Sequence, residues 1–199
     1  MNNTPLGNRK HIVIYGKTNS GKSSLINKLV GQDISIVSEK EGTTTDPVSK
    51  AMELIPVGPV VFYDTAGLYD NTELGSERTK KTIDLLKRTD IGIYVSDIND
   101  INEDEIKEGI LLFKQYNIPY VLVFNKCDNV SKDILDDIKI KYSNGIITSA
   151  KDNSGIEDLK NSLREIIEKE QEELPLVGDL LPYGSKVILV VPVDSEAPK

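Results

Sequence analysis

The chain has 199 residues, with 24 basic and 32 acidic side chains and a formal net charge of −8. This length fits one domain, and a hydrophobic content of 38% is enough for a core. The acidic balance argues against nonspecific nucleic-acid binding, which depends on Lys and Arg. The single cysteine excludes an internal disulfide, and the sequence shows no signal peptide and no apolar run that could span a membrane. We therefore expect a cytoplasmic protein that binds neither nucleic acid nor membrane.

The first motif follows a β-branched and aromatic run at residues 11–15. Gly16 opens GKTNSGKS, which matches the G-x-x-x-x-G-K-S pattern of a phosphate-binding P-loop. Glycines let backbone N–H groups close around phosphate oxygens, and the N-terminus of the following helix favours anions. Lys22 is expected to reach the β- and γ-phosphates of a nucleotide, and the Ser23 hydroxyl to ligate Mg²⁺. The alternative is a glycine-rich turn before an ordinary helix.

A helical pattern follows the P-loop, and Gly31 is placed to end that helix. The next stretch, residues 32–47, is polar and lacks a sustained period, which predicts a mobile loop. Within it, Thr44 is a candidate for a second side-chain ligand to Mg²⁺ while a γ-phosphate is present. A threonine-rich turn without any role is the alternative.

Two short apolar segments, residues 51–55 and 60–63, predict a β-hairpin. The second segment leads into DTAG, where Asp64 can hold Mg²⁺ through water and the Gly67 N–H can contact the γ-phosphate. An isolated D-x-x-G is usually a plain turn. Its position after a strand and downstream of a P-loop favours the nucleotide-binding interpretation.

The next segments predict alternating helices and strands. Residues 68–76 are polar, a helix is expected from about 77 to 88, and residues 91–96 form an apolar strand typical of a parallel sheet. Asn102 with a glutamate three residues later resembles a capping box that opens a helix to about residue 115. Four apolar residues of that helix are expected to face the sheet: Ile106, Ile110, Leu111 and Phe113.

The strand expected at residues 120–124 ends in NKCD, which starts at Asn125. The Asp128 carboxylate can accept hydrogen bonds from the N1–H and 2-amino groups of guanine, and the Lys126 stem can cover the base. Adenine presents no such pair of donors, so this site would discriminate strongly between the two bases.

A short strand at residues 146–148 leads to Ser149, Ala150 and Lys151, whose backbone can contact the guanine O6. An amphipathic helix to about residue 172 follows. Strands that alternate with helices predict an α/β fold with a doubly wound, mainly parallel sheet. In such sheets ligands bind at the carboxyl ends of the strands, where all of these motifs are expected to lie.

Together, GKTNSGKS, GTTTD, DTAG, NKCD and SAK resemble, in this order and over residues 11–172, the guanine-nucleotide motifs of the TrmE–Era–EngA–Septin-like GTPases. The resemblance implies a P-loop, Ras-like domain that binds GTP or GDP and hydrolyses GTP to GDP and phosphate. It also implies three sets of site residues. These are Asn19, Ser20, Gly21, Lys22, Ser23 and Ser24 for the phosphates; Asn125, Lys126, Asp128, Ser149, Ala150 and Lys151 for the base; and Ser23, Thr44 and, through water, Asp64 for Mg²⁺.

Asn19 stands where the potassium-activated, TrmE-like members of this group carry an asparagine. The resemblance implies that Asn19 and backbone carbonyls around Ser38 and Lys40 hold K⁺, which would stabilise charge that develops during hydrolysis. The alternative is that Asn19 only tolerates a left-handed turn. Leu68 occupies the position of the water-orienting glutamine of Ras-like enzymes, so slow hydrolysis is expected. Glu73 is a candidate for positioning the water, and an ordinary exposed glutamate is the alternative.

Residues 45–75 and 179–199 are similar to the HydF family, GTPases that participate in FeFe-hydrogenase maturation. In that family a dimerisation domain and an iron–sulfur domain follow, so no cluster is expected on this chain. Its partners would be other hydrogenase maturation proteins, the missing domains, or a second copy paired through a strand at 186–193. The implied organisation is a flexible N-terminus at 1–10, a GTP-binding domain at 11–173, and a linker with the start of a truncated domain at 174–199.

The leading interpretation is a Mg²⁺-dependent, potassium-activated GTPase that acts as a nucleotide switch in hydrogenase maturation. One alternative is an RNA- or ribosome-associated GTPase of the TrmE or Era type, which the net charge disfavours. Another is a scaffold module in which GTP is a structural ligand without turnover. The NKCD motif disfavours a kinase or an ATPase.

Overall fold

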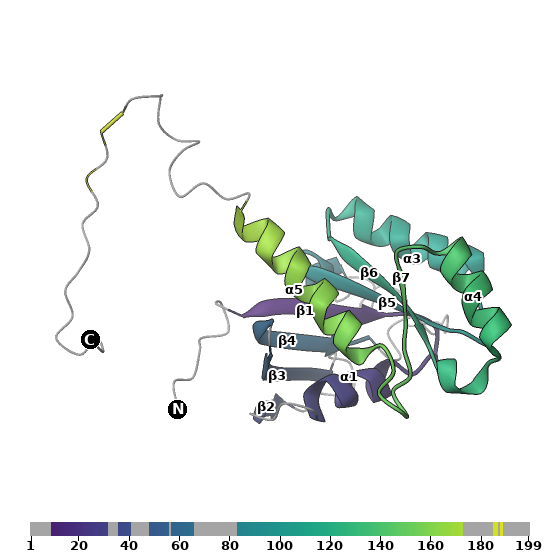
Figure 1. The fold of residues 1–199 in the computed structure, drawn as a ribbon. Coiled ribbons are helices and arrows are strands. Elements are labelled where there is room, and N and C mark those ends of the chain that lie inside the picture. Colours follow the sequence, from purple (N-terminus) through teal and green to yellow (C-terminus); the bar gives the residue numbers. More distant parts are fainter. Residues whose placement is uncertain are drawn as a thin grey trace, which may run out of the picture.

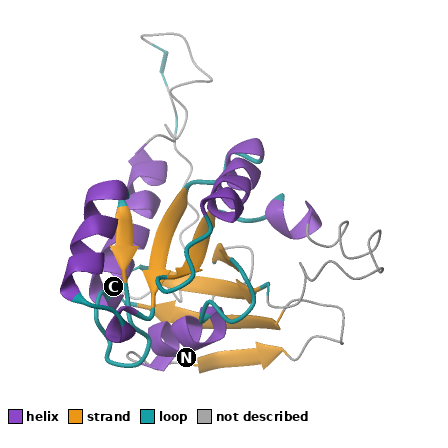
Figure 2. Ribbon diagram, turned by 90° about the vertical axis from the view of Figure 1, so that its right-hand side faces the viewer, coloured by secondary structure: helices purple, strands orange, loops and turns teal. Residues whose placement is uncertain are grey.

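The computed structural model describes residues 9–31, 36–40, 48–55, 57–65 and 83–172, together with residues 185, 186 and 188. These residues form a seven-stranded sheet in the order β2-β3-β4-β1-β5-β6-β7, with helices on both of its faces (Figure 1, Figure 2). The elements are β1 (Lys10–Tyr15), α1 (Lys22–Gly31), β2 (Ile36–Lys40), β3 (Val48–Leu54), β4 (Gly58–Asp64), β5 (Ile91–Asp97), α3 (Glu103–Gln115), β6 (Tyr120–Asn125), the 3₁₀ turn η2 (Cys127–Asn129), α4 (Lys132–Lys141), β7 (Gly145–Ile147) and α5 (Ile156–Glu172).

Strand pairing confirms the expected mainly parallel, doubly wound sheet. The pairs β1–β4, β1–β5, β5–β6 and β6–β7 are parallel, whereas β2–β3 and β3–β4 are antiparallel. The antiparallel pair β3–β4 is the predicted hairpin. Parallel strands need helical crossovers, which cover both faces and bury the central strands. The first six residues of β5 are accordingly all buried.

Two apolar clusters fill the spaces between the sheet and its helices. On one face, Ile12 and Ile14 of β1 pack with residues of α1 and α5; on the other, Val13 packs with Phe113 of α3 and Ile138 of α4. Successive side chains of a strand point to opposite faces, so a run of apolar residues in β1 serves both clusters. This packing fixes β1 in the middle of the sheet, directly before the P-loop.

The beginning of α3 shows the predicted capping arrangement. The Asn102 side-chain oxygen accepts hydrogen bonds from the Asp104 and Glu105 N–H groups at 3.1 and 3.4 Å, and its amide donates to the Glu105 carboxylate at 3.0 Å. These bonds satisfy N–H groups that have no partner within the helix.

Two local predictions are wrong. Residues 36–40 were expected in a loop but form β2, because the open edge of β3 supplies hydrogen-bonding partners that the sequence pattern does not reveal. Leu111 was expected to face the sheet but is 63% exposed, because α3 turns Ile106 and Phe113 inward instead. Residues 83–86 are helical, as expected, whereas 77–82 and the strand predicted at 186–193, apart from 186 and 188, lie outside the described residues.

Candidate functional site

The P-loop begins where β1 ends, and its first turn fits closely against the neighbouring strand. Gly16 has a φ of 144°, and a Cβ atom placed there would lie 2.1 Å from the Val95 carbonyl oxygen of β5. Such a contact is impossible for a side chain, so only glycine allows the loop to leave β1 in this direction. Asn19 and Gly21 also have positive φ, at 65° and 92°.

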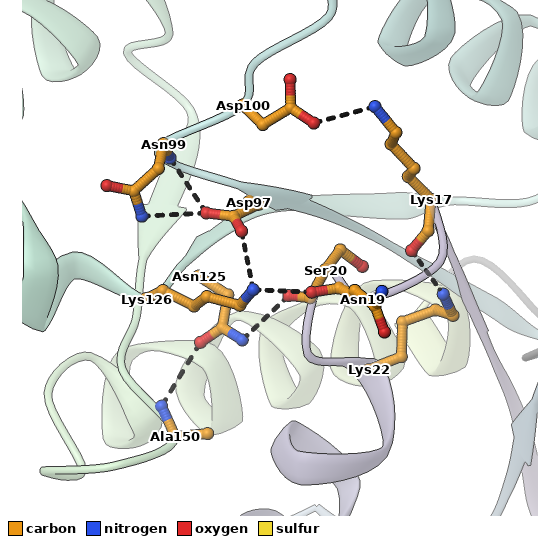
Figure 3. A network of polar contacts seen from close by, with 10 residues as sticks. All are labelled: Lys17, Asn19, Ser20, Lys22, Asp97, Asn99, Asp100, Asn125, Lys126 and Ala150. Carbon is orange, nitrogen blue, oxygen red and sulfur yellow. Dashed lines mark hydrogen bonds and ion pairs between the residues drawn. The ribbon is translucent and has the colours of Figure 1, made fainter.

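Lys22 lies at the start of α1 and is only 5% exposed. Its Nζ donates hydrogen bonds to the carbonyl oxygens of Gly16 and Lys17 at 2.8 and 2.7 Å. The side chain therefore folds back over the loop, and its ammonium group lies beside the backbone that is expected to enclose phosphates (Figure 3).

Ser23 and Asp64 come from different elements and meet at the edge of the P-loop. The Ser23 hydroxyl donates to the Asp64 carboxylate at 2.5 Å. Asp64 ends β4, which pairs with β1. The hydroxyl of the next residue, Thr65, donates a hydrogen bond to the Ile14 carbonyl oxygen of β1 at 2.6 Å. A hydroxyl and a carboxylate are oxygen donors of the kind that Mg²⁺ prefers, so these two residues fit the expected magnesium site.

The remaining expected ligands and catalytic residues belong to other segments of the chain. Thr44, Gly67 and Glu73 lie outside the described residues. Ser38 and Lys40 belong to β2, which β3 and β4 separate from β1. The left-handed φ of Asn19 agrees with the alternative, conformational reason for an asparagine at this position.

A pocket of about 300 Å³ adjoins the P-loop. Three segments that are far apart in the sequence meet there, because the ends of β1 and β6 and the loop after β7 lie at the same edge of the sheet. The residues that line the pocket are Gly21, Ser24, Asn125, Lys126, Asp128, Asn129, Ala150 and Lys151.

Asn125 joins these three segments through hydrogen bonds of its buried side chain. Its amide nitrogen donates to the Ser20 carbonyl at 3.1 Å, and its oxygen accepts from the Thr148 hydroxyl and the Ala150 N–H, both at 3.3 Å. The side chain is 1% exposed, so it acts as an internal link between the P-loop and the pocket. If the Ala150 N–H also donated to a base oxygen, its hydrogen would be shared between that oxygen and the Asn125 oxygen.

Asp128 presents a charged carboxylate to the pocket. The Ser149 hydroxyl donates to it at 2.8 Å, and the Lys151 ammonium lies 3.4 Å from its other oxygen. The hydrogen bond from Ser149, with a smaller contribution from Lys151, holds the pKa of Asp128 below its ordinary value. The side chain therefore remains an acceptor at neutral pH, as recognition of two N–H donors requires.

Lys126 crosses from the end of β6 to the P-loop. Its backbone is left-handed, with a φ of 69°, and its Nζ donates to the Asn19 carbonyl and to the Asp97 carboxylate, both at 2.6 Å (Figure 3). Sequence reasoning did not select Asp97. Its position at the carboxyl end of a buried strand, the same position as Asp64 on β4, is a signal that was available.

Residues 11–126 match the family model described as "50S ribosome-binding GTPase". The chain belongs to this family of GTPases. GTP binding and GTP hydrolysis, expected from the five motifs, are the properties of its G-domain relatives.

Two similar GTPases are longer than this chain. The tRNA modification GTPase MnmE of Cytophaga hutchinsonii is 36% identical over 177 residues, which cover 87% of this chain and 38% of the relative. GTPase Der of Kosmotoga olearia is 33% identical over 180 residues, which cover 82% of this chain and 40% of the relative. The chain thus spans about two fifths of the length of these relatives.

Solved structures agree on the fold. A variant of Era from Aquifex aeolicus bound to GDP and AlF₄⁻ has a TM-score of 0.60 at 24% identity and covers 78% of this chain and 56% of that one. Era in a complex with MgGDPNP and part of 16S ribosomal RNA has a TM-score of 0.60 at 23% identity and covers 90% and 59%.

These comparisons bear on which group of GTPases the chain resembles. The similarity to MnmE and Der supports the TrmE-type group of GTPases, whereas these comparisons do not show the expected similarity to HydF. Within the described part of the chain, no helix has both the length and the apolar character needed to cross a membrane.

Proposed function

We propose that this GTPase binds GTP with Mg²⁺ along the P-loop and the adjoining pocket, and that it acts as a nucleotide-dependent switch within a longer protein. One observation carries the proposal. The P-loop, the Ser23–Asp64 pair and a pocket with a charged carboxylate meet at a single edge of the sheet. Sites at this edge are typical of doubly wound folds.

In the base pocket, Asp128 would accept hydrogen bonds from the N1–H and 2-amino groups of guanine, and the stem of Lys126 would pack against the base. Ser149 and Lys151 support this role, because they hold the Asp128 carboxylate in its charged form. Ala150 and Lys151 would approach O6 through their backbone. Their N–H groups already donate within the protein, at 3.3 Å to Asn125 and 3.2 Å to Ser149, so they would have to share these bonds.

At the phosphates, the P-loop backbone from Asn19 to Ser24 would supply N–H donors, and Lys22 would neutralise negative charge. Ser23 and Asp64 would hold Mg²⁺, which when bound would neutralise negative charge on the phosphates. By resemblance to the family, Thr44 and Gly67 would complete the site in the GTP-bound form, and Glu73 would position the attacking water.

Potassium activation is a finer proposal, and it depends on the Asn19 side chain. Asn19→Gly is the informative variant, because glycine retains the left-handed φ of 65° without strain while it removes the amide. We expect K⁺ to accelerate wild-type GTP turnover about tenfold or more over Na⁺ at equal ionic strength, and to leave the variant unaccelerated. The measurement is phosphate release in KCl and in NaCl, with Mg²⁺ present.

Equal acceleration of both proteins would show that Asn19 has only a conformational role. Equal wild-type rates in the two salts would refute potassium activation altogether. Neither result would affect Mg²⁺-dependent GTP hydrolysis, which omission of Mg²⁺ tests in the same assay.

For the partner of the switch, we propose RNA or a ribosomal particle, a class supported by the similarity to the tRNA modification GTPase MnmE and by the family model described as "50S ribosome-binding GTPase". A second candidate, hydrogenase maturation, is supported by the resemblance of residues 45–75 and 179–199 to HydF. In that case residues 174–199 would begin a dimerisation domain.

Disruption of the gene separates the two candidates. If the partner is RNA or a ribosomal particle, we expect the disrupted strain to accumulate incomplete ribosomal subunits or undermodified tRNA while its hydrogenase activity stays normal. Loss of active FeFe-hydrogenase with a normal ribosome profile and normal tRNA would instead support the second candidate. Sucrose-gradient profiles, tRNA analysis and hydrogen evolution are the measurements.

A further inference from the structure

We infer that Asp97 is a positioning residue for nucleotide binding, and that it holds Lys126 between the base pocket and the P-loop. Asp97 ends β5 and does not line the pocket. Its proposed effect is therefore indirect and acts through Lys126. This inference deepens the proposed function and rests on the assignment of the pocket to guanine.

Each carboxylate oxygen of Asp97 has its own partner. Oδ1 accepts hydrogen bonds from the backbone and side-chain N–H groups of Asn99, at 2.9 and 3.0 Å, and Oδ2 accepts from Lys126 Nζ at 2.6 Å. The bonds from Asn99 fix the orientation of the carboxylate, so its second oxygen points to Lys126 (Figure 3). The group is built into the turn after β5.

The ion pair between Asp97 and Lys126 is partly shielded from solvent. The Asp97 side chain is 22% exposed and that of Lys126 is 34% exposed. Burial raises the pKa of Asp97, but the hydrogen bonds from Lys126 and Asn99 outweigh this effect and bring the pKa below its ordinary value. The carboxylate is thus charged at neutral pH, and its attraction for the ammonium group is screened less than on an open surface.

Lys126 transmits this constraint to the P-loop. Its Nζ also donates to the Asn19 carbonyl at 2.6 Å, and its Cε lies 3.8 Å from the position of a Cβ at Gly21. The stem therefore runs past the P-loop glycine and lines the pocket. Loss of the Asp97 charge would leave the long side chain with a single backbone acceptor, and its rotamer freedom would weaken both its cover of the base and its hold on the loop.

A neighbouring acidic residue provides a matched control. Asp100 lies in the same turn and forms an ion pair of 2.8 Å with Lys17, but the two side chains are 64% and 48% exposed. Exposed pairs of this kind contribute little. Asp100→Asn removes the same charge from the same turn and leaves the Asp97–Lys126 contact in place.

The experiment measures the dissociation constants of fluorescent GDP and of a nonhydrolysable GTP analogue, with thermal unfolding of each nucleotide-free variant. We expect Asp97→Asn to raise both constants about tenfold, because the residue supports a charged hydrogen bond to Lys126. Asp100→Asn should stay within about twofold of the wild type. Asp97→Glu, which retains the charge, should recover most of the affinity.

A double-mutant cycle tests the route through Lys126. We expect Asp97→Asn to have no further effect on affinity in a Lys126→Met background. Additive losses, or a weakened affinity with the same drop in unfolding temperature for Asp97→Asn and Asp97→Glu, would overturn the inference and assign Asp97 a purely structural role. Failure of the wild type to prefer GDP to ADP would refute the assignment of the pocket to guanine instead.

Discussion

Asp128→Asn is expected to raise the dissociation constant for GTP by roughly a thousandfold, because a site built to accept two hydrogen bonds from the base discriminates strongly against a mismatch. Asparagine offers one acceptor oxygen and an NH₂ group, and this NH₂ group would face the 2-amino group of guanine. Two donors would then meet in a pocket of about 300 Å³. Nucleotide competition at constant Mg²⁺ measures the change.

The same Asp128→Asn substitution is expected to reverse the preference between two nucleotides. Xanthine carries an oxygen in place of the 2-amino group, so it can accept a hydrogen bond from the new amide. We expect XTP to bind the variant more tightly than GTP does, whereas the wild type prefers GTP. Asp136→Asn, which removes an exposed carboxylate from α4, serves as the control for loss of charge. A GTP affinity within tenfold of the wild type would contradict the proposed role of Asp128.

Gly16→Ala is expected to lower the free energy of unfolding by about 3–5 kcal/mol. A Cβ at this position would lie 2.1 Å from the backbone oxygen of Val95, and the φ of 144° is one that alanine rarely adopts. The neighbouring atom belongs to the backbone of a central strand, so it cannot move aside as a flexible side chain would. Urea unfolding of the nucleotide-free protein measures the difference from the wild type.

Gly58→Ala separates the two causes of this loss. Gly58 also has a positive φ, at 101°, but a Cβ atom there would have no neighbour within 4 Å among the described residues. Both substitutions change the unfolded chain in the same way. We expect Gly58→Ala to lower stability by only about 1–2 kcal/mol. Equal losses for the two variants would show that backbone strain, and not the contact with Val95, restricts position 16 to glycine.

The sequence was most informative where a single segment has a complete local pattern. The P-loop, the β3–β4 hairpin and the helix that begins after Asn102 all depend on residues that lie close together in the chain. Spacing, turn chemistry and capping residues are local properties, so they are visible without a structure. The prediction that these motifs meet at the carboxyl ends of parallel strands followed from general rules of sheet topology.

Other features depend on neighbours that are remote in the sequence. β2 forms because the edge of β3 is open, and Leu111 is exposed because of the rotation of α3 on the sheet. Helix α4 was not predicted. Of its isoleucines, Ile138 is buried, whereas Ile134 and Ile140 are 45% and 81% exposed, so its apolar pattern is weak. The residue types of α4 therefore do not reveal which side of this helix meets the core.

The sequence by itself determined the family, the guanine-nucleotide motifs and the α/β class of this GTPase, because each is encoded in short patterns of residue type. Only the tertiary structure decided which carboxylate holds Lys126. Asp97 and Lys126 are 29 positions apart. Asp97 ends β5 and Lys126 directly follows the neighbouring parallel strand β6, so the register of the two strands brings them together. An ion pair of this kind leaves no spacing signal, since its geometry depends on how the strands pair.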